Sequence, residues 1–186
     1  MGSIAVLKGN LAPEGAVVKY SACEKSMRSH KGRAVVFDCE EDAIHAILTH
    51  AVHPGEAVFI RYEGPKGSGM PEMFYYHRGD LVGPGARPKH RAHHRRPFLR
   101  CDSWRSHRSR FSGAVNGGTI AYVQDGDIIS IDIPNHSIQL EVSDEELAER
   151  KKTTKILVKE NLTGYLKRYS KMVSSADKGA IINRMD

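Results

Sequence analysis

The chain has 186 residues, of which 40% are hydrophobic, and a net charge of +6. This length can bury the core of one domain, and no apolar run approaches the roughly 20 residues that a membrane-spanning helix needs. The first ten residues lack a signal-peptide pattern, so we expect a soluble, cytoplasmic protein with no membrane partner. Three widely spaced cysteines, Cys23, Cys39 and Cys101, contain no CxxC pair and indicate neither a disulfide framework nor a zinc site.

The first 63 residues have the pattern of an α/β protein. Short apolar runs predict strands at 16–20, 34–37 and 57–62. Between the last two strands, Asp38 is a candidate N-cap for a helix that ends before the Pro-Gly pair at 54–55. We expect this helix to pack on a sheet through an apolar face made of Ala43, Ile44, Ile47, Leu48 and Ala51.

The last third predicts strands followed by helices. Alternating apolar and polar residues predict an antiparallel meander of strands at 119–123, 127–133 and 137–142. A capping box that starts at Ser143 predicts a charged, exposed helix to about residue 152. A last helix should begin near Thr163, where apolar residues recur at helical spacing: Leu162, Tyr165, Leu166, Tyr169, Met172 and Val173.

Positive charge concentrates between the two halves, at residues 86–113. This segment contains eight Arg, one Lys and one Asp, a net charge of +8. Since the whole chain carries +6, the rest of the chain is slightly acidic. Apolar residues are few and aperiodic, so we expect an irregular segment over about 77–112. A basic nucleic-acid-binding module is the alternative function from another class. Because only Phe98, Trp104 and Phe111 could stack on bases, we expect no specific nucleic-acid partner. We also expect no functional metal site from the four histidines of this segment, His90, His93, His94 and His107.

Six stretches, in this order, resemble the C-terminal domain of the dihydroxy-acid and sugar-acid dehydratase family. They are GNLAPEGAVVK (9–19), FDCEEDAIHAI (37–47), RYEGPKGSGMPEM (61–73), GGTIAYVQDGDIISIDIPN (117–135), VSDEELAER (142–150) and YSKMVSSADKGA (169–180). The resemblance implies a mixed α/β, β-rich fold: a barrel-like, swivelling domain with flanking helices. We expect one domain over 1–186, with a helical tail at 151–186 and without the family's N-terminal, cluster-binding domain.

The resemblance also implies a hydro-lyase that converts a 2,3-dihydroxy acid to a 2-keto acid, with branched-chain amino acid biosynthesis favoured over the alternative, sugar-acid substrates. The family uses an iron–sulfur cluster, Mg²⁺ and a deprotonated serine. Neither Cys23 nor Cys39 matches a cluster ligand, since those cysteines belong to the N-terminal domain. The PEM glutamate is Glu72, which the resemblance makes a Mg²⁺ ligand. We expect this domain to contact the N-terminal domain of the same enzyme. The full-length protein is expected to be a homodimer.

The serine lies in a family motif, TDGRFSG, that is missing where the resemblance places it. Residues 90–100 can be encoded so that the frame one nucleotide later reads Ile-Ala-Leu-Ile-Thr-Asp-Gly-Arg-Phe-Ser-Gly. We therefore expect two compensating frame errors, near residues 75–76 and 112–113, with the serine codon straddling Leu99 and Arg100. Ser112 stands in a second RFSG, but it lacks the preceding Thr-Asp-Gly, so we interpret it as a coincidental match.

We expect the chain alone to be inactive. A stand-alone structural or regulatory protein is the third hypothesis.

Overall fold

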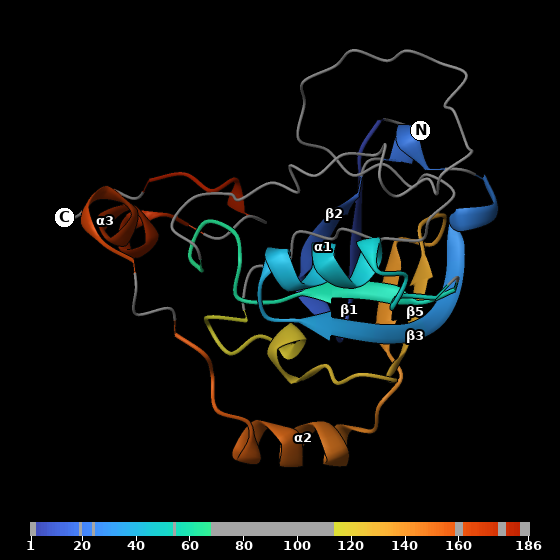
Figure 1. Ribbon diagram of the computed structural model, residues 1–186. Helices are drawn as coiled ribbons and strands as arrows, with labels where there is room; N and C mark the ends of the chain where they lie inside the picture. The colour runs from blue at the N-terminus through green and yellow to red at the C-terminus, as the bar shows by residue number, and fades with distance from the viewer. Residues whose placement is uncertain are drawn as a thin grey trace.

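The computed structural model describes residues 3–18, 20–23, 25–53, 55–67, 114–158, 162–174 and 178–182, which form a mixed α/β fold (Figure 1). The α/β class predicted from the sequence is confirmed. The strands are β1 (Ala5–Gly9), β2 (Ala12–Val18), β3 (Ser29–Phe37), β4 (Ala57–Ile60), β5 (Ile128–Asp132) and β6 (Ser137–Leu140). The helices are α1 (Glu40–Leu48), α2 (Asp144–Thr153) and α3 (Gly164–Met172), with 3-10 turns η1 (Tyr20–Ala22), η2 (Lys25–Met27) and η3 (Thr119–Tyr122).

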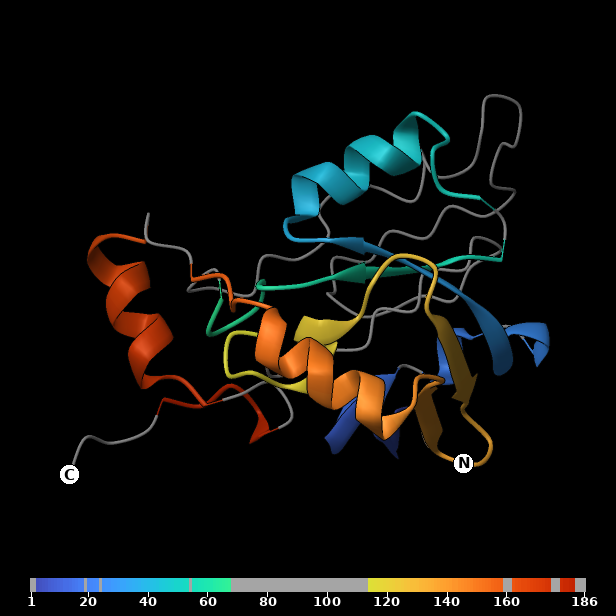
Figure 2. The same ribbon diagram turned by 90° about the horizontal axis from the view of Figure 1, so that it is seen from below.

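The six strands form one curled sheet in the order β2-β1-β6-β5-β3-β4. Strand β3 is shared between two partners. Its first half, Ser29–Arg33, runs antiparallel to β5, and its second half, Ala34–Phe37, runs parallel to β4. Helix α1 contacts β3 and β4, whereas α2 contacts η3 on the other side of the fold (Figures 1 and 2). The sheet buries the largest core side chains, among them Leu7, Leu11, Ile129, Ile138 and Leu140.

The predicted meander is confirmed only in its last two strands. Strands β5 and β6 pair antiparallel, with Ile131 opposite Ile138. The strand predicted at 119–123 is wrong, because residues 119–122 form the buried 3-10 turn η3. A strand needs a neighbouring strand whose amides donate to its carbonyls. Here the side chains of Arg61 and Arg150 donate to the carbonyls of residues 121–123 instead. Strand β1 was not predicted.

Helix α1 is confirmed, but its predicted N-cap is wrong. The N-cap residue is Cys39, whose side chain makes no capping bond. The Asp38 carboxylate binds Arg61. The predicted apolar face is only partly buried. Ala43 is fully buried, whereas Leu48 is 45% exposed. The packing of α1 is therefore looser than the sequence pattern suggested.

The two C-terminal helices begin where predicted. Ser143 caps α2, and its hydroxyl accepts a hydrogen bond from the Glu146 amide at 3.2 Å. Helix α3 follows its N-cap, Thr163, and buries none of its residues. In the described part of the chain, no helix is long and apolar enough to cross a membrane. A closed barrel and the single-domain span stay predictions, and the irregular segment predicted at 77–112 lies outside the described residues.

Candidate active-site edge

The carboxyl ends of β3 and β4 form the candidate site. These strands are parallel and in register from Ala34 and Ala57 onwards, so both end at the same edge of the sheet. Asp38 follows the end of β3, and Arg61 follows the end of β4. The Arg61 amide donates the last bond of this ladder, to the Phe37 carbonyl at 2.8 Å. In sheets with parallel strands, ligands bind outside such carboxyl ends, so this edge is where chemistry is expected.

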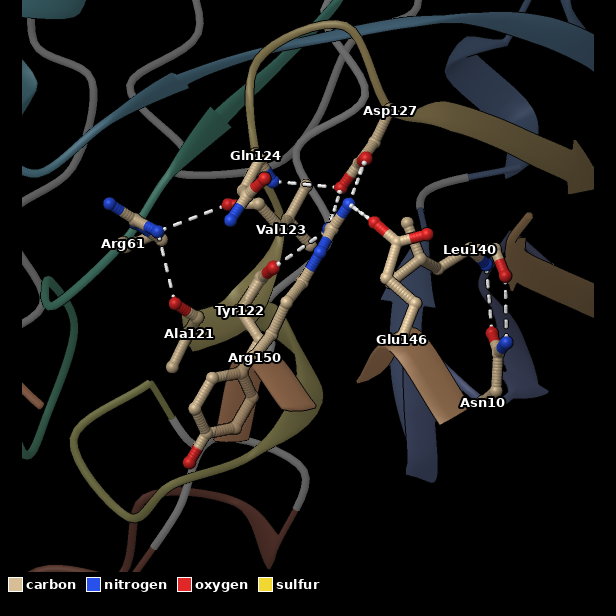
Figure 3. A network of polar contacts seen from close by, with 10 residues as sticks. All are labelled: Asn10, Arg61, Ala121, Tyr122, Val123, Gln124, Asp127, Leu140, Glu146 and Arg150. Carbon is tan, nitrogen blue, oxygen red and sulfur yellow. Dashed lines mark hydrogen bonds and ion pairs between the residues drawn. The ribbon is translucent and has the colours of Figure 1, made fainter. Parts of the chain in front are cut away.

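The Arg61 guanidinium joins three segments at this edge, and Figure 3 shows its bonds to one of them, residues 121–123. Its Nε donates to Asp38 Oδ1 at 2.7 Å, and its Nη2 forms an ion pair with the same oxygen at 2.6 Å. Its Nη1 donates to the carbonyls of Ala121 and Val123 at 3.0 and 3.1 Å. A planar guanidinium has several donors in fixed directions, which lets one side chain hold a carboxylate and two carbonyls together.

Arg150 holds the same segment from the opposite side (Figure 3). Its Nη1 and Nη2 form a two-bond pair with the carboxylate of Asp127, at 2.6 and 2.9 Å. Nη1 also donates to the Tyr122 carbonyl at 3.1 Å, and Nη2 to Glu146 at 2.5 Å. The hydrogen bonds that Arg150 donates to the Asp127 carboxylate outweigh burial and raise the pKa of Arg150 above its usual value. Three consecutive carbonyls, at 121, 122 and 123, are thus bound by two arginines.

The loop after Arg61 folds back on itself. Tyr62 is buried and adopts a positive φ of 59°, which is uncommon for a residue other than glycine. Gly67 returns to the start of the loop, where a Cβ on it would lie 2.0 Å from the Tyr62 carbonyl oxygen. Glycine is therefore required at position 67, because the protein's own backbone leaves no room there for a Cβ.

The predicted site residues themselves lie outside the described residues. This applies to Glu72, to Ser112 and to the Leu99–Arg100 junction. Within the described ranges, no group of three or more His, Cys, Asp or Glu side chains could hold a metal ion. The Cys39 thiol lies beside this edge, and burial raises its pKa, with the neighbouring Asp42 contributing.

Sequence reasoning missed the polar residues that organise the edge. Asp38 was interpreted as a helix cap, and Arg61 only as the first letter of a motif. Arg150 was placed on an exposed helix, yet its side chain is 10% exposed. One signal was available for the first pair: opposite charges directly follow two strands that were predicted to flank one helix, and parallel strands of that kind end at the same edge.

Comparison with known proteins gives a consistent result. The family model described as "Dihydroxy-acid/6-phosphogluconate dehydratase C-terminal" matches residues 1–88 and 112–180. A dihydroxy-acid dehydratase of Agathobacter rectalis is 47% identical over 97% of this chain and 32% of its own length. Those of Acetivibrio thermocellus and Aquifex aeolicus are 46% and 45% identical, over 97% of this chain and 33% of theirs. The chain thus spans about one third of the length of these curated relatives.

Proposed function

Because the chain belongs to the dihydroxy-acid/6-phosphogluconate dehydratase family and matches its C-terminal domain, we propose that it is the C-terminal domain of a dihydroxy-acid dehydratase. The reaction would remove water from a 2,3-dihydroxy acid to give a 2-keto acid. The observation that carries the proposal is identity of about 45% to enzymes of that name over nearly the whole chain. A branched-chain precursor is favoured over a sugar acid as substrate, since the relatives named above are all dihydroxy-acid dehydratases.

The edge of β3 and β4 would supply the binding surface of this domain. The described residues at this edge bind one another. Arg61 binds Asp38 and the 121–123 segment, and this fixes the start of the loop that leads to the PEM motif. Glu72 follows in the same motif, and we propose it as a Mg²⁺ ligand on the strength of the resemblance. A carboxylate oxygen is a ligand type that Mg²⁺ prefers.

The remaining groups would come from the N-terminal domain that precedes this one in the family. Hydroxide is a poor leaving group, and a C–H beside a carboxylate is a weak acid, so metal charge would help both bonds to break. Within this chain, the described residues would hold and orient the loop that presents Glu72. The iron–sulfur cluster and homodimer formation belong to the complete enzyme.

The base serine would be missing from this reading frame. The family model leaves residues 89–111 unmatched, and this interval contains the Leu99–Arg100 junction where the serine codon would fall. The match resumes at Ser112, where the second frame error is placed, but it also extends to residue 88, beyond the first error expected at 75–76. We therefore propose that Ser112 is not the base and that the chain as it stands is inactive.

A chimeric enzyme tests this function. The N-terminal two thirds of the Agathobacter rectalis relative would be joined to this chain, either unaltered or with residues 76–113 replaced by the translation of the other frame. We expect the replaced form to turn over a branched 2,3-dihydroxy acid and the unaltered form to be inactive. In the replaced form, substitution of the PEM glutamate (Glu72→Gln) should lower turnover.

Two outcomes would contradict the proposal. One is turnover by the unaltered chimera, which would mean that the serine is not missing. The other is an inactive replaced chimera beside an active relative that was purified in the same way. Preference for a sugar acid over the branched acid would move the assignment to the sugar-acid branch of the family.

A further inference from the structure

We propose that Arg61 is a positioning residue that fixes the Tyr62–Gly67 loop on the carboxyl edge of the sheet. The inference rests on the proposed function in one respect: this loop leads to the motif that carries Glu72. The structural argument depends only on described residues.

The last ladder bond of the sheet lies at the start of this loop. Beyond Ile60, the sheet adds one ladder bond, from the Arg61 amide to the Phe37 carbonyl. Tyr62 then turns into the left-handed region, where a strand cannot continue. The loop therefore leaves the sheet at Arg61, and its direction depends on how this residue is held.

The loop is closed at its base. Gly67 packs against the Tyr62 carbonyl so closely that a Cβ would not fit. The Arg61 guanidinium lies 5.4 Å from the centre of the Tyr62 ring, within cation–π range, and that ring is almost fully buried. Because the two ends of the loop, Tyr62 and Gly67, are in contact, we expect residues 62–67 to move together as one unit.

The side chain of Arg61 connects this unit to two other parts of the fold. Asp38 lies at the end of β3, and the carbonyls of Ala121 and Val123 belong to the segment that leads into β5. Four donor contacts from one side chain thus define the position of the loop in more than one direction. Arg150 offers a natural comparison, since it holds the Tyr122 carbonyl of the same segment, while its other hydrogen bonds within the described residues go to Asp127 and Glu146.

Amide hydrogen exchange of the intact 186-residue chain, followed by mass spectrometry, tests the inference. With Arg61→Met, we expect peptides that cover 62–67 to exchange at least about tenfold faster, while peptides from β5 and β6 are unchanged. The matched control is Arg150→Met, which should accelerate exchange in α2 and leave 62–67 unchanged. Both variants are compared under conditions in which circular dichroism shows them folded.

A conservative variant separates positioning from general stability and remains informative if Arg61→Met does not fold. In Arg61→Lys, the ammonium can pair with Asp38 but cannot also reach two carbonyls in fixed directions. We expect its melting temperature to recover most of the loss seen in Arg61→Met, while exchange at 62–67 stays fast. Recovery of both together, or slow exchange at 62–67 in both variants, would overturn the inference. Turnover is not measured here, so failure of the dehydratase assignment would be seen separately, in the chimeric enzyme.

Discussion

Replacement of Arg150 by methionine should be among the most destabilising single changes in this domain. The side chains of Arg150 and Asp127 are 10% and 8% exposed, so the pair is shielded from water. Without the guanidinium, Asp127 keeps the Gln124 amide at 2.8 Å but loses two charge-assisted bonds. The Tyr122 carbonyl loses a donor as well.

The size of the effect follows from this burial. Removal of one partner from a buried ion pair costs about 3 to 5 kcal/mol, because the other charge is left without compensation. Domains of this size lose roughly 2 to 4 °C in melting temperature per kcal/mol, so the midpoint should fall by about 6 to 20 °C. Urea unfolding followed by circular dichroism would measure the free energy directly.

An exposed pair on the same helix provides the control. Lys152 and Glu149 are 3.2 Å apart and 73% and 63% exposed. Lys152→Met should therefore change the free energy of unfolding by less than about 1 kcal/mol. If Arg150→Met cost no more than Lys152→Met, the buried pair would not hold α2 against η3 as described.

Three further predictions concern other parts of the fold. Hydrogen bonds from Lys31 and Ser130 hold the pKa of Glu141 below its usual value, so the stability they add is present above about pH 4.5 and is lost as the pH falls. Glu141→Gln should accordingly flatten the decline of the urea midpoint between about pH 5 and pH 3. Burial raises the pKa of the Cys39 thiol, so iodoacetamide should alkylate it more slowly than glutathione at pH 8. Gly9→Ala should separate β1 from β6, since its Cβ would lie 1.8 Å from the Ile138 carbonyl oxygen, and faster amide exchange in both strands would show this.

Features with local causes were predicted well from the sequence. The second half of β3, strand β4, the β5–β6 pair and the starts of α2 and α3 all depend on periodicity or caps within a few residues, whereas Ser29–Arg33 of β3 was not predicted. Ser143 is an example, because its hydroxyl bonds an amide three residues away. The long-range features were not predicted. Asp38 binds a residue 23 positions later, and Arg150 binds carbonyl and carboxylate groups 28 and 23 positions earlier.

The site depended on a different kind of information. Glu72 and the missing serine came from resemblance, since no spacing or composition in the chain identifies either of them. The acidic and basic residues of the carboxyl edge are visible in the sequence, yet a lone Arg after a strand is usually solvated. The three-dimensional register of β3 and β4 shows that Arg61 and Asp38 meet.

The bonds from Arg61 to Ala121 and Val123 join residues that are 60 and 62 positions apart. Together with the pairing of β3 with β5, these non-covalent contacts hold the parts of the chain before residue 68 and after residue 113 against each other. The entropic cost of closing a loop rises only slowly with its length, so the number of residues between these positions has little influence on this association. We therefore expect the domain to accept new chain termini in that interval: a circular permutant opened there should retain the β3–β5 pairing.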